Sequence, residues 1–193
     1  RVLIVNTETG ENVGQGVACY PRWKAGLYQH PEHSIFRQHP LDYLESLEKC
    51  ITTALAELTE EQKDHVIGIG VDTTGSTPVP VDKNGTPLAL LDEFAENENA
   101  MFFLWKDHAA AAEADEINKL FRNNSENDYT KYQGDYSAEW YWAKILYAVR
   151  HDEAIRQAAY TWEEHCDWMT GILCGETRPE KIYHSACAAG HKA

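Results

Sequence analysis

The chain has 193 residues, of which 17 are Lys or Arg and 31 are Asp or Glu, so its formal net charge is −14 at pH 7. A chain of this length can bury roughly 70% of its unfolded surface without help from a disulfide or a metal, and its negative charge repels nucleic-acid phosphates and anionic membranes. We therefore expect one domain that binds neither nucleic acid nor membrane.

The first predicted elements are a hairpin and a loop. Val2–Val5 and Val13–Tyr20 read as two strands joined by a Thr-Gly-Glu turn at Thr7–Glu11. Residues Arg22–Pro40 follow no clean period, so an extended loop is expected there.

A long helix follows the loop. Apolar residues recur at every third or fourth position from Leu41 to Leu58, which is typical of an amphipathic helix that covers a sheet. The sequence Thr59-Glu-Glu-Gln62 then resembles a capping box. It predicts a short helical turn before the next strand.

The most informative segment is Val66–Pro80, which reads VIGIGVDTTGSTPVP. Its short β-branched apolar run predicts a doubly buried strand that delivers the polar loop Asp72–Thr77 to the edge of a sheet, where open α/β folds bind ligands. The alternative is an ordinary junction between a strand and a turn, in which Asp72 bonds to its own backbone. The loop is thus the first candidate for a binding site.

A second hairpin and two capped helices are predicted next. Val79–Val81 and Thr86–Leu91 flank an Asn-Gly pair, which favours a tight turn. Asp107 can cap a helix that runs to about Phe121, and Ser137 can cap the helix after it. The buried positions expected in that later helix are Trp140, Ala143, Ile145, Leu146 and Val149.

The last predicted elements are a pair of helices at Asp152–Tyr160 and Thr161–Leu173, the second ending at Gly175. The tryptophans of this half fall at helical positions, which favours packing over a stacking role.

The cysteine pattern and the chain ends indicate the cellular compartment of the protein. The five cysteines are odd in number and form no Cys-x-x-Cys pair, which favours reduced thiols. No apolar run approaches the ~20 residues of a membrane span, and Arg1 is followed by a strand-like run and not by a signal peptide. We expect a cytoplasmic protein. Because the chain begins with Arg inside a strand and ends at Ala193 in a loop, we also expect it to be a piece truncated at both ends.

Four strings in the sequence carry a specific resemblance. They are GIGVDTTGSTPVPVD (residues 68–82), EFAENENAMFFLWKDH (93–108), YSAEWYWAKIL (136–146) and SACAAGHK (185–192). In this order they resemble the N-terminal lobe of the FGGY carbohydrate kinase family, and within it the kinases that act on L-ribulose. The resemblance runs along essentially the whole chain.

The resemblance implies a fold and an activity. The fold would be an actin-like ATPase (ribonuclease H-like) lobe of the α/β class, with a mixed central sheet flanked by helices and without its first strand. The reaction would be transfer of the γ-phosphoryl group of ATP, with Mg²⁺, to the terminal hydroxyl of L-ribulose in arabinose breakdown. Such a step needs positioning, charge neutralisation and a carboxylate that accepts the hydroxyl proton.

The resemblance implies that the motifs which bind ATP and take part in phosphoryl transfer lie outside this sequence. The phosphate loop would precede Arg1, and the carboxylate base and the adenosine-binding motifs would follow Ala193 in the missing C-terminal lobe. No catalytic residue is therefore expected here, and the isolated chain should be inactive. The sequence does not decide between a monomer and a homodimer.

The resemblance assigns residues 1–193 to the sugar-binding domain and points to several sugar contacts. Gly75, Ser76 and Thr77 combine small size with hydroxyl groups, which allows close approach to a polyol. Asp72 is expected to hold their loop in shape.

Three further contacts come from the later strings. Trp105 and Asp107 match a family segment near the sugar, although Asp107 is also a natural helix cap. Lys192 matches a lysine that reaches the sugar hydroxyls. His108 and His191 lack the spacing of a zinc site, so no metal ligands are predicted.

Other functions stay open at this point. The sugar could be xylulose, fuculose or glycerol, and the chain could be a sugar-binding or interaction lobe without catalysis. A strand that ends in Asp-x-Thr-Gly also resembles aspartyl-phosphate hydrolases, but Thr74 stands where their second acid is needed.

Overall fold

The computed structural model of the chain describes residues 1–124, 126 and 128–186. The chain forms two compact units, one made of residues 1–27 and 39–70 and the other of residues 28–38 and 71–193. Both contain helices and strands, which confirms the α/β class. No helix among the described residues is long and apolar enough to cross a membrane.

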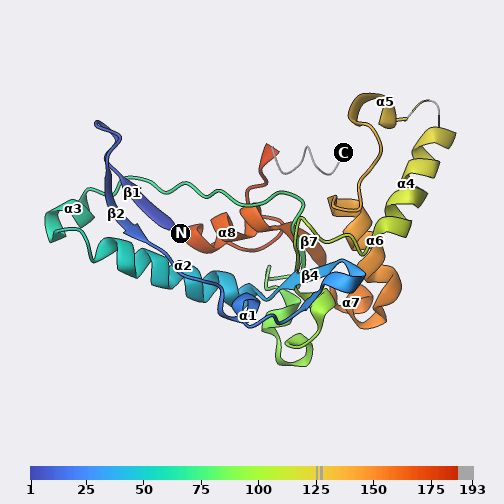
Figure 1. Cartoon of the computed structure of the whole chain (residues 1–193), viewed down its shortest axis with the longest axis horizontal. Coiled ribbons are helices and arrows are strands. Elements are labelled where there is room, and N and C mark those ends of the chain that lie inside the picture. Colours follow the sequence, from blue (N-terminus) through green and yellow to red (C-terminus); the bar gives the residue numbers. More distant parts are fainter. Residues whose placement is uncertain (125, 127, 187–193) are drawn as a thin grey trace. The chain divides into compact units, whose positions relative to one another are not determined.

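The first unit is a hairpin packed on a helix (Figure 1). Strands β1 (Val2–Val5) and β2 (Asn12–Gly16) pair antiparallel, as predicted. They pack against α2 (Pro40–Leu55), which begins after His39, whose ring nitrogen accepts a hydrogen bond from the Leu41 amide. The buried side chains at this contact include Cys50, Ala54 and Leu58.

Two short helices complete this unit. Helix α1 (Pro21–Lys24) lies beside α2, and the Arg22 guanidinium binds Asp42 and Glu45. Helix α3 (Glu60–Asp64) has the predicted capping box, because Thr59 Oγ1 accepts from the Gln62 amide and Gln62 Oε1 accepts from the Thr59 amide.

The close contact between β2 and α2 requires a glycine at position 16. A Cβ atom added at Gly16 would lie 2.0 Å from the Cys50 carbonyl oxygen, so β2 can approach α2 this closely only without one. We expect Gly16→Ala to destabilise this unit by about 2 kcal/mol, the usual cost of overpacking a close contact. Gly68→Ala is the matched control, because nothing lies within 4 Å of its added Cβ. Urea unfolding followed by circular dichroism measures both variants, and equal stability would contradict the packing argument.

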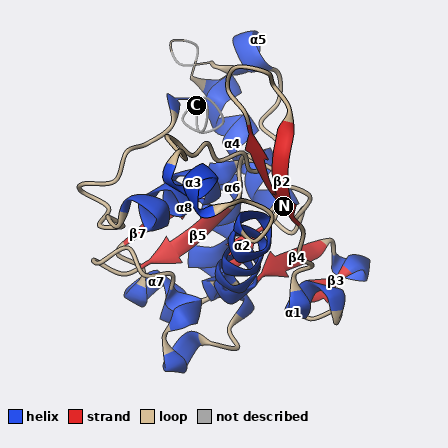
Figure 2. Cartoon of the chain, turned by 90° about the vertical axis from the view of Figure 1, so that its left-hand side faces the viewer, coloured by secondary structure: helices blue, strands red, loops and turns tan. Residues whose placement is uncertain are grey.

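The described part of the second unit contains two small sheets. One has the order β3 (Gln29–His30), β4 (Ile35–Gln38), β6 (Phe102–Phe103), and its pairs are antiparallel. In the other, β5 (Pro78–Val81) runs antiparallel to β7 (Thr161–Glu164), side by side in Figure 2. All four residues of β5 are buried.

Helices surround these strands. Within the described residues, the α-helices with assigned bounds are α4 (Ala111–Asn123), α5 (Thr130–Gln133), α6 (Tyr141–His151), α7 (Glu153–Ala158) and α8 (His165–Cys174). The 3₁₀ turns are Pro31–His33, Leu88–Leu90, Asp92–Phe94 and Glu98–Ala100. Two predicted ends are confirmed: Asp152 caps α7, and Gly175 closes α8 with a left-handed φ of 71°.

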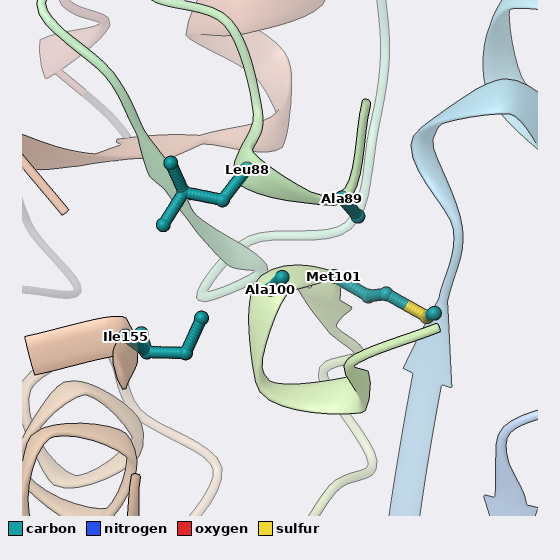
Figure 3. Close-up of a cluster of buried hydrophobic side chains, with 5 residues drawn as sticks. All are labelled: Leu88, Ala89, Ala100, Met101 and Ile155. Atoms are coloured by element: carbon teal, nitrogen blue, oxygen red, sulfur yellow. The ribbon is translucent and has the colours of Figure 1, made fainter. Parts of the chain in front are cut away.

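One part of the core gathers short segments that are far apart in the sequence. Figure 3 shows Leu88, Ala89, Ala100, Met101 and Ile155, which are all buried in one cluster. They lie on two 3₁₀ turns, directly after the second of these turns and on α7, which explains why no single period in the sequence marks them. Nearby, Trp168 of α8 is fully buried and its ring lies 5.3 Å from that of Phe102.

The largest difference from the sequence prediction concerns residues 66–71. They are extended but form no strand, and 85% of Ile67 and 70% of Ile69 are exposed. An apolar run becomes a buried strand only where neighbouring strands accept its backbone hydrogen bonds and helices cover its faces. Among the described residues, the sheets are antiparallel and have two or three strands, so the single mixed central sheet is also not formed here.

Several smaller predictions were also wrong. Residues 22–40 contain α1, β3 and β4 in place of an extended loop. Residues 86–91 bond to Val81 through one bridge and then form a 3₁₀ turn, because β7 is the strand that pairs with β5. The segment Thr161–Glu164 is that strand, so the last helix begins only at His165.

Two predicted caps are displaced. Helix α4 begins after Ala110, and Asp107 accepts instead from the Ala109 amide in the preceding turn. Helix α6 begins after Trp140, and Ser137 accepts from the Glu139 amide. The fully buried face of α6 contains Ala143 as predicted, together with residues that the pattern did not indicate: Tyr141, Lys144 and Ala148.

Candidate functional site

The candidate loop, residues 72–77, leads directly into β5. Gly75 is exposed, whereas Ser76 and Thr77 are buried at 4% and 0% exposure. The Thr74 and Thr77 hydroxyl oxygens lie 2.9 Å apart and hydrogen bond across the bend. Asp72 is exposed and contacts no other described residue through a hydrogen bond or ion pair; the hydrogen bond across the bend is made by the two threonines.

Ser76 has two unusual properties. Its backbone φ is 54°, the left-handed region that residues with a side chain rarely occupy. Its hydroxyl is buried and has no hydrogen-bond partner among the described residues. Strained backbone and an unused buried polar group persist at a cost, and both concentrate at sites that bind ligands.

Two buried charged side chains fix this loop from outside. The Thr77 amide donates to Glu164 Oε2 at 3.0 Å, and Lys144 Nζ donates to the Ser76 carbonyl oxygen at 2.6 Å. Glu164 ends β7 and Lys144 lies on α6, so both anchors come from regular elements. Their side chains are fully buried.

The second candidate segment, residues 104–107, is a tight turn after β6. The Leu104 amide donates to the Phe36 carbonyl at 3.1 Å, and the Asp107 amide donates back to the Leu104 carbonyl at 2.9 Å. Trp105 is 49% exposed at the tip of this turn. An exposed aromatic ring beside a polar turn is a suitable surface for a sugar.

Asp107, in contrast, faces inward. One carboxylate oxygen accepts from the Ala109 amide, and the other accepts from the Phe36 amide and from the Arg37 guanidinium. Arg37 is 1% exposed and lies over the Phe103 ring, 3.5 Å from its centroid. Burial lowers the pKa of Arg37 to about 9. In this structure the contacts of Asp107 hold the turn together.

The lysine on α6 connects the two segments. Besides the Ser76 carbonyl, Lys144 Nζ donates to the Leu104 carbonyl at 2.9 Å. Removal from water lowers the pKa of Lys144 to about 7, and the negative charge of Glu164 acts in the opposite direction. The structure thus brings Ser76, Thr77 and the Trp105 turn together around one buried amine.

The remaining predicted residues lie elsewhere. Lys192 and His191 fall outside the described residues. The His108 ring nitrogen Nε2 lies 2.7 Å from Glu139 Oε1 at the surface. Among the described residues, no three His, Cys, Asp or Glu side chains converge in a way that could hold a metal ion.

The sequence did not lead us to expect that Lys144 and Glu164 anchor the candidate loop. The available signal for Lys144 was its spacing, since Tyr141, Lys144 and Ala148 occupy one helix face at i, i+3 and i+7. A lysine between buried positions on one face indicates a buried cation, and such a group needs nearby acceptors.

Comparison with known proteins gives matches along the whole chain. It is 51% identical over 194 residues to the ribulokinase of Vibrio parahaemolyticus, 36% identical over 198 residues to that of Halalkalibacterium halodurans and 34% identical over 199 residues to that of Mycolicibacterium smegmatis. Each match covers 100% of this chain but 34% of the relative, so the chain spans about a third of the length of these proteins. No family model matches it.

Proposed function

This chain is homologous to ribulokinases along its whole length and fits an N-terminal fragment of one, and from this premise we propose that it is the sugar-binding domain of an ATP-dependent ribulokinase. The observation that supports this proposal most strongly is the 51% identity to the Vibrio parahaemolyticus ribulokinase over the full chain. In the complete parent protein, L-ribulose would receive the γ-phosphoryl group of ATP at its terminal hydroxyl.

The proposal divides the work between two lobes. This chain supplies the sugar contacts, proposed as Gly75, Ser76, Thr77, Trp105, Asp107 and Lys192. The buried Ser76 hydroxyl and the half-exposed Trp105 support it, because the first is a hydrogen-bonding group without a partner among the described residues and the second is an accessible ring. For Asp107, the internal contacts favour an indirect contribution through the Trp105 turn.

The remainder of the parent supplies the reacting groups. We propose that ATP and Mg²⁺ bind mainly there, together with the carboxylate that accepts the sugar proton, and that the complete protein has the actin-like fold and a cytoplasmic location. The α/β elements of this chain are consistent with such a lobe. When bound, ATP would provide the phosphoryl group and Mg²⁺ would neutralise its charge; the residues of this chain would orient the sugar.

A coupled ATP-consumption assay tests the proposal. We expect the complete parent to consume ATP with L-ribulose far faster than with D-xylulose, glycerol or L-fuculose, because recognition of hydroxyl positions discriminates strongly. The isolated chain at equal concentration should give no signal above a blank without sugar. Preference of the parent for another sugar would contradict the substrate, and turnover by the isolated chain would contradict the division between lobes.

A further inference from the structure

The starting observation is that one nitrogen atom binds two separate stretches of backbone. Lys144 Nζ donates to the carbonyl oxygens of Ser76 at 2.6 Å and of Leu104 at 2.9 Å. Both carbonyls accept from the same atom, so the two carbonyl oxygens cannot lie farther apart than two hydrogen-bond lengths. The loop and the Trp105 turn are thereby fixed relative to each other.

Each stretch is also bonded to a second group. The Thr77 amide, next to Ser76, donates to Glu164 Oε2, and the Leu104 carbonyl accepts a further hydrogen bond from the Asp107 amide. The loop therefore has anchors on α6 and β7, whereas Lys144 is the anchor that it shares with the turn.

Direct contact between Lys144 and a ligand is excluded by burial. The side chain is 0% exposed, and its nitrogen points into the two carbonyls. A neutral amine still has two N–H groups, so both bonds can form in either protonation state. The contact is suited to holding geometry and not to proton transfer.

We propose that Lys144 is a positioning residue of the sugar site, which holds Ser76 and Thr77 at a fixed distance from Trp105. This inference rests on the proposed function, since it assumes that both segments contact the sugar. Ser76 is held in a left-handed conformation with its hydroxyl unpaired among the described residues, and the bond from Lys144 to its carbonyl opposes relaxation of that strain.

The test uses Lys144→Met in the complete parent kinase. Methionine retains an apolar stem of similar length and removes every donor. We expect KM for L-ribulose to rise by about tenfold or more, while KM for ATP changes by less than about twofold, because misplacing substrate contacts weakens binding of that substrate alone. The matched control is Lys119→Met on α4, where the lysine is exposed; it should leave both constants unchanged.

Hydrogen exchange on the same proteins provides a second measurement. In Lys144→Met, we expect the hydrogen-bonded amides of Thr77, Leu104 and Asp107 to exchange at least about tenfold faster, with α2 unaffected. If the variant does not fold, hydrogen exchange of the wild-type parent tests the proposal. The loop at Ser76 and Thr77 and the Trp105 turn should then open together. Amide exchange rates of the two segments that differ by more than about tenfold would overturn the proposal. Equal rises in both KM values, or an unchanged KM for L-ribulose, would overturn it too.

The two proposals fail in different ways. If the wild-type parent does not act on L-ribulose, the proposed function is wrong, while joint protection of the Thr77, Leu104 and Asp107 amides by Lys144 still supports a structural role for this lysine. If L-ribulose is the substrate and Lys144→Met behaves as wild type, the function stands and the positioning role is wrong.

Discussion

Replacing Asp107 by alanine is expected to lower the free energy of unfolding by about 3 to 5 kcal/mol, the usual result of removing one partner from a buried ion pair. The Arg37 guanidinium would remain at 1% exposure without its carboxylate. The Phe36 and Ala109 amides would lose their acceptor at the same time. Urea unfolding of the chain followed by tryptophan fluorescence and by circular dichroism measures the effect.

Glu153→Ala is the matched control for this prediction. Glu153 pairs with Arg156, but both side chains are more than half exposed, at 59% and 57%. Exposed pairs are screened by water and contribute little, so this variant should unfold at nearly the wild-type urea concentration. Similar losses in Asp107→Ala and Glu153→Ala would contradict the importance that we assign to burial.

Acidification is expected to destabilise the second unit through His165. Burial lowers the pKa of this histidine to about 3 in the folded chain, whereas an unfolded histidine has a pKa of about 6.5. Between these values the unfolded state binds a proton that the folded state does not. Stability from this group is therefore complete above pH 6.5 and is lost as the pH falls toward 3, by about 1.4 kcal/mol per pH unit or roughly 3 kcal/mol at pH 4.5.

The variant His165→Phe isolates this contribution. Phenylalanine preserves an aromatic ring beside Phe102, whose centroid lies 5.1 Å from that of His165, and it cannot titrate. The loss of melting temperature between pH 7.5 and pH 4.5 should be clearly smaller in the variant than in the wild type. His33→Gln serves as the control, because its side chain is 71% exposed. An acid dependence that His165→Phe leaves unchanged would count against the assignment.

Local rules predicted the elements whose signals lie within a few residues. The hairpin at β1 and β2, the stripe of α2, the capping box at Thr59 and the left-handed end at Gly175 all depend on neighbours in the sequence, and the structure confirms each. The run Val66–Val71 has an equally clear local signal. Whether it is buried depends on strands and helices that must come from elsewhere, and its composition alone cannot reveal whether they are present.

The same distinction between local signals and long-range contacts applies to the candidate site. The loop at Ser76 could be found because a β-branched run followed by small hydroxyl residues is a local pattern. The burial of Lys144 has a local signal in its helix face, but the anchoring role of Lys144 and Glu164 does not, because it is defined by bonds to residues 40 to 87 positions away. Asp107 was predicted as a sugar contact or a helix cap, but its pairing with Arg37 depends on β4 and β6 meeting in space.

The exposed run at residues 66–71 has a consequence for handling this polypeptide. Ile67 and Ile69 protrude into water, and exposed apolar side chains that lie close together favour association between chains. Mutual repulsion from the net charge of −14 counteracts such adhesion, and salt weakens that repulsion. This polypeptide should therefore aggregate most readily in concentrated solutions of high ionic strength, with association beginning at the two isoleucines.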